Sequence, residues 1–179
     1  MESKPIGKLR NGFTTGTCAT ASAKAGLTAL INQKVIDNVD VKLPRGDSIN
    51  IKIHNCEFTK TSSKCSVIKD GGDDPDVTHG AEIIVDLMLT DSTNQIEIDG
   101  GEGVGIVTKP GLGLEINKPA INPVPKKMIT ENLIESGKKI LEKNGIKVII
   151  SVPKGKEIAL KTDNPRLGIV GGISILGTS

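Results

Sequence analysis

TTGTCATASAKA, residues 14–25, predicts the start of a helix whose surface is made of unusually small side chains. Its threonines offer hydroxyl groups for an N-cap, and we expect the helix to run from Thr17 to about Ile31. Between Cys18 and Gly26 the residues are almost all small, with Lys24 as the exception. A helix with such a surface can approach another backbone closely.

Apolar and polar residues alternate in much of the chain that follows, which is typical of half-buried strands. A hairpin is predicted from residues 39–43 and 49–53, which flank the turn-forming residues 44–47. Further strands are expected at 66–69, 82–89, 96–98, 105–108 and 147–152, and a second helix from about Pro125 to Asn144, ended by Gly145. This order predicts an α+β domain rather than a regular βαβ series.

The composition favours a globular domain, because 36% of the residues are hydrophobic and 25% are charged. Phe13 and Phe58 are the only aromatic residues, so the core must be built from Ile, Val, Leu and Ala. Few aromatic rings for base stacking and a net charge of +2 without a long basic block argue against nucleic-acid binding. No run approaches the ~20 apolar residues of a membrane span, so no membrane partner is expected.

Two further features bear on location and completeness. The three cysteines form no CxxC pair and the N-terminus has no apolar signal-peptide region, so a reducing cytoplasm is expected. The chain ends in the apolar run from Gly168 to Gly177, which predicts that the sequence is part of a longer protein.

The turn that opens the first helix predicts an anion site, because backbone N–H groups are free there and the helix dipole is positive. Its residues are Thr14, Thr15, Gly16 and Thr17. The alternative, favoured by spacing alone, is ordinary N-capping with close packing of small residues. A thiolate nucleophile at Cys18 is a less favoured hypothesis, because neither histidine is near it in the sequence.

A second motif, KDGGDDPDVTHG at residues 69–80, is dense in titratable groups. They are Asp70, Asp73, Asp74, Asp76 and His79. Such a group can bind a hard cation through oxygen, or supply a general acid or base with a shifted pKa. The spacing does not match an EF-hand loop, and a solvated turn of the Asx type is an equally good interpretation.

A third motif follows a short apolar strand in IEIDGGEGVGIVTKPGLG, residues 96–113, and contains Asp99, Gly101, Gly103 and Gly105. This spacing is similar to the glycine-rich turn of Rossmann-type methyltransferases, which lets the backbone approach S-adenosylmethionine. In that fold a helix follows the glycines, whereas here Pro110 prevents one. A cofactor loop and a tight structural loop therefore both remain open.

Lys126 and Lys127 are expected at the start of the second helix, where the helix dipole disfavours cations. A bound anion would offset that cost. On the residues alone, a pair of solvated lysines is the favoured interpretation.

Four long segments together resemble one protein family, from Leu9 to Ser179. They are LRNGFTTGTCATASAKA, IKDGGDDPDVTHGAEI, IDGGEGVGIVTKPGLGLEINKPAINPVPKKMI and NPRLGIVGGISILGTS. They are similar to the CbiD family of cobalt-precorrin-5B (C-1)-methyltransferases. The resemblance implies that residues 1–179 form the N-terminal α+β domain, with a mixed or antiparallel sheet, two main helices and a topology like a circularly permuted second domain of a ribosomal protein. The family's C-terminal α/β domain would be absent from this chain.

The resemblance also implies a function, methylation of cobalt-precorrin-5B at C-1 by S-adenosylmethionine in anaerobic cobalamin biosynthesis. Cobalt would belong to the corrinoid substrate, and no metal site of the protein is expected. The donor would bind at the third motif, and proton transfer would fall to the titratable residues of the second. The substrate's carboxylates would bind at the start of the first helix and at Lys109, Lys126, Lys127 and Arg10. Other copies of the chain in a homo-oligomer are a further potential partner.

Two other classes of function stay open. One is a metal-dependent phosphoryl-transfer or hydrolytic enzyme that uses the loop from Asp70 to His79. The other is a non-catalytic ligand-binding or assembly domain, which predicts no turnover by this chain alone.

Overall fold

Five strands form the central sheet of the computed structural model, which describes residues 10–73 and 76–177. The strand order is β3-β4-β5-β8-β6, with β8 and β6 parallel and the other neighbours antiparallel. The elements are α1 (Thr15–Asn32), β1 (Asn38–Lys42), β2 (Ser48–Lys52), β3 (Asn55–Phe58), β4 (Ser62–Ile68), β5 (Glu82–Thr90), β6 (Ile96–Gly100), β7 (Ile106–Val107), α2 (Pro123–Ser136), α3 (Lys138–Leu141), β8 (Gly145–Ser151), α4 (Gly155–Ala159), α5 (Asn164–Leu167) and β9 (Ile169–Val170). The predicted α+β class with a mixed sheet and two main helices is confirmed.

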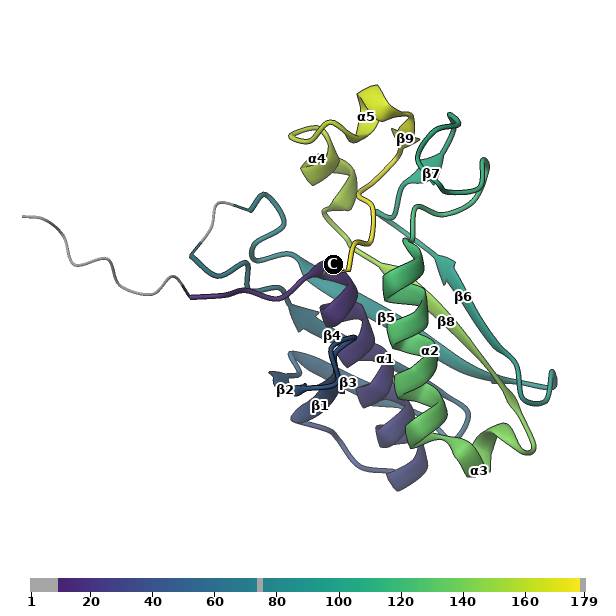
Figure 1. The fold of residues 1–179 in the computed structure, drawn as a ribbon. Helices are drawn as coiled ribbons and strands as arrows, with labels where there is room; N and C mark the ends of the chain where they lie inside the picture. Colours follow the sequence, from purple (N-terminus) through teal and green to yellow (C-terminus); the bar gives the residue numbers. More distant parts are fainter. Residues whose placement is uncertain (1–9, 74–75, 178–179) are drawn as a thin grey trace, which may run out of the picture.

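The two main helices, α1 and α2, lie side by side on one face of the sheet (Figure 1). Residues of β5 and β8 that point toward the helices are fully buried, as Val85, Leu87, Val148 and Ile150 show. The core therefore lies between this sheet face and the helix pair. It consists of aliphatic side chains, as the scarcity of aromatic residues requires.

The small side chains of α1 allow the predicted close approach. A Cβ atom on Gly26 would lie 2.5 Å from the Ser63 hydroxyl oxygen of β4, and one on Gly16 would lie 2.8 Å from the Leu176 carbonyl oxygen. Alanine, serine and threonine fill most of the buried surface between these two positions. The helix is consequently buried along most of its length, between the sheet, α2 and the β1–β2 hairpin.

The predicted hairpin is confirmed as β1 and β2, with Val41 opposite Ile49. The strand expected at residues 66–69 is longer and begins at Ser62, and its partner β3 was not predicted. In β3 the two exposed residues are polar, and Cys56 and Phe58 are half-buried. A strand of only four residues is too short for this alternation to stand out in the sequence. The strands expected at 82–89, 96–98, 105–108 and 147–152 are present as β5, β6, β7 and β8.

The single helix expected from Pro125 to Asn144 is wrong in its extent. The helix α2 begins at Pro123, a favoured residue at the first helical position, and ends at Ser136. Gly137 then has φ −122° and ψ 26°, which separates α2 from the short α3. A Cβ atom on Gly137 would lie 2.8 Å from Leu27 Cδ2, so the absence of a side chain allows close contact with α1 here. Because α2 starts earlier than expected, Lys126 lies one turn inside it.

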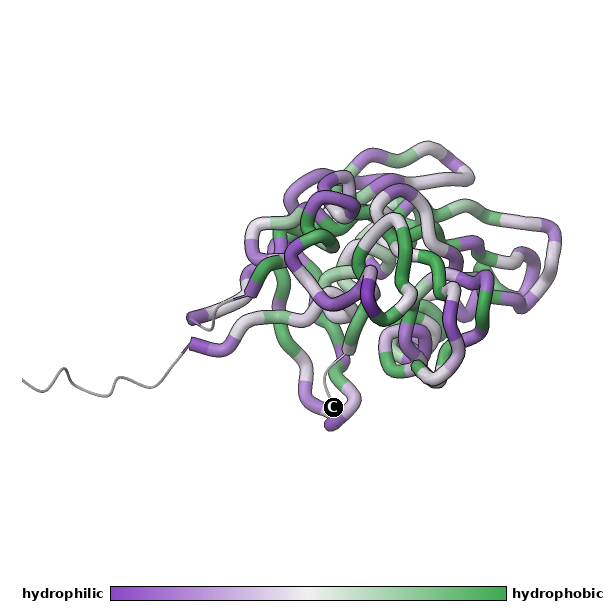
Figure 2. The backbone as a smooth tube through the Cα atoms, turned by 90° about the horizontal axis from the view of Figure 1, so that it is seen from above, coloured by the Kyte–Doolittle hydropathy of each residue, from purple (hydrophilic) through white to green (hydrophobic). Residues whose placement is uncertain are grey.

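The strands β7 and β9 and the helices α4 and α5 gather at one end of the molecule (Figure 1). Figure 2 views the molecule from this end and shows hydrophobic and hydrophilic stretches alternating along the chain. The apolar run at the end of the chain packs here, since Ile173 and Ile175 are buried and bridge to Val104 and Ile121. Of the helices in the described ranges, none combines the length and hydropathy that crossing a lipid bilayer requires.

Candidate functional site

Segments that are far apart in the sequence meet around a cavity of about 440 Å³. They are the start of α1, the loop after β4, the α4–α5 connection and the last described residues, whose end lies beside the first turn of α1 in Figure 1. We call this the Lys69 cavity. Its lining residues are Thr14, Thr15, Lys69, Asp76, Val77, Thr78, Thr162, Asn164, Ile173, Ser174, Leu176 and Gly177.

The first turn of α1 is fastened to the end of the chain. Thr14 is the N-cap, and its hydroxyl oxygen accepts the N–H of Thr17 at 3.0 Å. The Gly16 N–H donates to the Leu176 carbonyl at 2.7 Å, while the Thr15 hydroxyl accepts the Leu176 N–H at 2.9 Å. Two N–H groups of the predicted anion site are thus engaged by the protein itself. Thr14 and Thr15 still line the cavity, but their hydroxyl groups donate to Thr17 Oγ1 at 2.9 Å and to the Leu176 carbonyl at 3.2 Å.

The cavity contains an ion pair between a buried lysine and a partly exposed aspartate. Lys69 is 3% exposed, and its Nζ lies 2.5 Å from Asp76 Oδ2. The other carboxylate oxygen of Asp76 accepts the Thr78 N–H at 2.8 Å and the Thr78 hydroxyl at 2.5 Å. The Asp76 carboxylate therefore accepts three hydrogen bonds, one of which pairs the buried charge of Lys69.

These bonds predict a pH dependence of stability. Partial burial opposes ionisation, but hydrogen bonds from Lys69 and Thr78 outweigh it and lower the pKa of Asp76 to about 2, from an ordinary 3.8. The stabilisation is therefore present above pH 3.8 and is lost as the pH falls toward 2. Urea unfolding between pH 2 and 7 is expected to show this loss in the native protein. A smaller loss is expected in Asp76→Asn, and an unchanged profile in that variant would contradict the assignment.

Two other predicted acids serve to fasten the chain segment before α1. Asp70 forms an ion pair with Arg10, and Asp73 Oδ2 accepts the Arg10 backbone N–H at 2.5 Å. The hydrogen bond from Arg10 is the main cause that lowers the pKa of Asp70. Neither acid lines the Lys69 cavity, so their predicted catalytic role stays a prediction and their observed contacts are structural.

The remaining residues of that motif are His79 and Asp74. His79 Nδ1 accepts the Gly71 N–H at 2.9 Å on the exposed side of the loop. Asp74 lies outside the described residues. Across the ranges that the structure describes, no three His, Cys, Asp or Glu side chains are grouped to hold a metal ion. Of the five predicted titratable residues, Asp76 alone is shown to line the cavity.

The glycine-rich motif packs against the protein's own backbone. Gly103 has φ +75°, and a Cβ atom there would lie 1.7 Å from the Val152 carbonyl oxygen. A Cβ atom on Gly105 would lie 2.8 Å from the Gly172 carbonyl oxygen. The predicted donor-binding residues Asp99, Gly101, Gly103 and Gly105 do not line the Lys69 cavity. Protein atoms thus fill the space that a closely approaching cofactor would take, and donor binding there stays a prediction.

Lys109 and Lys126 are exposed and lie outside the lining of the cavity. The aliphatic stem of Lys109 covers Gly168, and Lys126 sits on the solvent face of α2. Their predicted contact with substrate carboxylates stays a prediction.

Cys18 is fully buried in α1. Burial raises the pKa of its thiol to about 12, although the Lys69 ammonium works in the opposite direction. The thiol is therefore protonated at neutral pH, which disfavours the nucleophile hypothesis.

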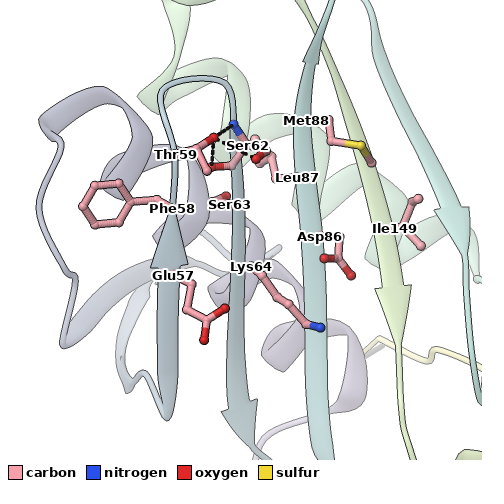
Figure 3. A pocket seen from close by; sticks show the side chains of 10 residues that line it. All are labelled: Glu57, Phe58, Thr59, Ser62, Ser63, Lys64, Asp86, Leu87, Met88 and Ile149. Carbon is pink, nitrogen blue, oxygen red and sulfur yellow. Dashed lines mark hydrogen bonds between the residues drawn. The ribbon is translucent and has the colours of Figure 1, made fainter.

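A larger hollow of about 560 Å³ lies on the other face of the sheet (Figure 3). Glu57, Lys64 and Asp86 stand on neighbouring strands there, in register with one another. Beside them, Thr59 and Ser62 are joined by a hydrogen bond of 2.9 Å. The charged residues are ordinary cross-strand neighbours at a sheet surface, and none was predicted as a site residue. The Lys69 cavity is the stronger candidate because it holds a buried charge.

Comparisons with known proteins identify the family of this chain. The model of the CbiD family matches residues 2–179. The chain belongs to the CbiD family. A cobalt-precorrin-5B C(1)-methyltransferase of Geobacillus kaustophilus (strain HTA426) is 52% identical over 99% of this chain and 47% of the relative. One from Geobacter metallireducens is 47% identical over 100% of this chain and 49% of the relative.

A CbiD crystal structure has the same fold. The cobalamin biosynthesis protein CbiD of Archaeoglobus fulgidus is 34% identical, with a TM-score of 0.69 over 97% of this chain and 54% of that chain. The chain spans about half the length of the curated CbiD relatives it matches. The predicted C-terminal α/β domain of the family is not tested by these comparisons and stays a prediction.

Two parts of the site were not predicted from the sequence. Lys69 continues the period of two set by the inward-facing Ser63, Cys65 and Val67, so strand alternation places it inside. The segment from Ile173 to Gly177 gave no signal for its partner, because its contacts with Thr15 span 161 residues.

Proposed function

We propose that this chain forms the N-terminal half of an enzyme that methylates cobalt-precorrin-5B at C-1, with S-adenosylmethionine as the donor. The observation that carries the proposal is about 50% identity across nearly the whole chain to relatives named for that reaction. The Lys69 cavity is the part of the domain best suited to take part. Cobalt enters with the corrinoid substrate.

Methyl transfer from a sulfonium suits the groups around this cavity. The sulfur–methyl bond breaks as the methyl–carbon bond forms, an electron pair of the corrinoid ring makes the new bond, and sulfur keeps the old pair. No protein nucleophile is needed, so alignment and fixed charges provide the catalysis. Lys69 and Asp76 supply such charges, and the protonated thiol of Cys18 is no obstacle.

A metal-dependent phosphoryl-transfer or hydrolytic enzyme is less well supported. Arg10 and Lys69 occupy the carboxylates of Asp70 and Asp76 that a divalent cation would need. A non-catalytic role stays open for the chain in isolation.

The proposal is tested with methyl-labelled S-adenosylmethionine and cobalt-precorrin-5B. The chain is assayed alone and with the C-terminal half of the Geobacillus kaustophilus relative, and label in the corrinoid is measured after chromatography. Label is expected with both halves present, and it should persist in EDTA because methyl transfer from a sulfonium requires no protein-bound metal. Absence of label under conditions where the intact relative is active would contradict the proposal. Loss of transfer in EDTA would favour the metal-dependent alternative.

A further inference from the structure

The Lys69 cavity presents one positive and one negative group side by side. Lys69 Nζ and Asp76 Oδ2 are 2.5 Å apart on the same wall. Their charges nearly cancel, so the wall is not a general attractor of anions. It is matched instead to a ligand group that carries both charges.

Both members of the pair retain bonding capacity. An ammonium has three donors, and within residues 10–73 and 76–177 the bonded acceptor of Lys69 Nζ is Asp76 alone. Among the described residues, Asp76 Oδ1 accepts two bonds from Thr78, whereas Oδ2 accepts one, from Lys69. Because Lys69 is 3% exposed, bulk water does not satisfy its free donors. Two donors and one acceptor are thus left for whatever fills the cavity.

The rest of the lining suits a small polar molecule with an apolar part. Thr162, Asn164 and Ser174 add hydrogen-bonding groups, and Val77 and Ile173 add apolar surface. A volume of about 440 Å³ lies within the range of small-molecule sites. A corrinoid carboxylate on Lys69 would bring no positive charge to Asp76, whereas a zwitterion brings one charge to each member of the pair.

We propose that the Lys69 cavity binds the zwitterionic amino-acid end of the methyl donor, with its carboxylate on Lys69 and its ammonium on Asp76. The inference rests on the proposed function for the identity of the donor. It places the donor at the junction of α1, the loop after β4 and the last described residues. Gly103 and Gly105 of the glycine-rich turn hydrogen-bond to Ile173 of the lining but do not line the cavity themselves.

Two ligands that differ only in the amino-acid end test the proposal by isothermal titration calorimetry. S-adenosylhomocysteine carries that end, and 5′-methylthioadenosine lacks it. The chain is expected to bind the first roughly 10- to 100-fold more tightly, as loss of charge-assisted hydrogen bonds implies. Lys69→Met is expected to remove this preference while leaving affinity for methylthioadenosine unchanged. Lys34→Met, just beyond the C-terminal end of α1, is the matched control and should bind both ligands as the native chain does.

Asp76→Asn provides a second variant that keeps the shape of the side chain. It should also reduce the preference for S-adenosylhomocysteine, whether or not Lys69→Met folds, and thermal unfolding verifies the fold of each variant. The proposal is overturned if the native chain shows no preference, if it binds neither ligand, or if both folded variants keep the preference. Methyl transfer is measured separately. If variants with unchanged donor affinity still transfer the methyl group, this donor site is rejected while the proposed function is retained.

Discussion

Gly103→Ala is expected to lower the free energy of unfolding by about 4 kcal/mol or more, which is enough to unfold many domains. The added Cβ atom would lie 1.7 Å from the Val152 carbonyl oxygen and 3.1 Å from Gly155 Cα. Backbone on that side cannot rotate away as a flexible side chain can. Urea unfolding followed by circular dichroism measures the loss of stability. A variant that yields no folded protein would show that the loss exceeds the stability of the domain.

Gly113→Ala is the matched control for this experiment. Gly113 has φ +69°, close to the +75° of Gly103, but among the described residues no atom lies within 4 Å of the place that its Cβ atom would take. The variant therefore carries the strain of the left-handed conformation without the collision, and a loss of about 1 kcal/mol is expected. Equal losses in the two variants would show that the loop around Gly103 relaxes, and would reopen that turn as a place where a cofactor could enter.

Asp76→Ala is expected to destabilise the domain by about 3 kcal/mol at pH 7, because it leaves the charge of Lys69 buried without its partner. Lys69→Met is expected to lower the free energy of unfolding by less than about 1 kcal/mol. Methionine fits the buried site, and Asp76 without Lys69 keeps its contacts with solvent and Thr78. Asp76 is 33% exposed and keeps both hydrogen bonds from Thr78. Loss of Asp76 is therefore expected to destabilise the domain more than loss of Lys69, because the Lys69 charge has the greater need of its partner.

The double variant Lys69→Met with Asp76→Ala makes this argument quantitative. Once the buried charge is gone, removal of Asp76 should cost little more than the loss of its bonds to Thr78. The double variant is therefore expected to be more stable than Asp76→Ala alone, as measured by urea unfolding at pH 7. Equal costs for the two single variants, or strictly additive losses, would argue that Lys69 has another partner for its charge.

The sequence predicted the first helix and most strands because their signals are local. Thr14 is an N-cap, and the alternation of Val41 with its neighbours identifies a strand without knowledge of the rest of the fold. The break at Gly137 has a different origin. Gly137 lies against Leu27, 110 positions earlier in the chain, and periodicity within the helix cannot reveal such a contact.

The candidate site was predictable in part. The start of α1 and the aspartate motif were singled out, and the structure brings Thr14, Thr15 and Asp76 together around one cavity. Composition could not show which acids would be occupied by Arg10, nor that Gly103 would lie against the Val152 carbonyl. Both outcomes depend on long-range packing, as does the arrival of Leu176 at the first turn of α1.

The position of β8 in the sheet has a consequence for how the chain folds. The ribosome synthesises β8 after β5 and β6, yet β8 lies between them in the sheet and pairs with both. Until residues 145–151 have left the ribosome, β5 presents an open, largely aliphatic edge that can pair with another chain. Pairings that span so much sequence form slowly. Synthesis of this domain therefore includes an interval of exposed sheet edge in which a chaperone would prevent aggregation.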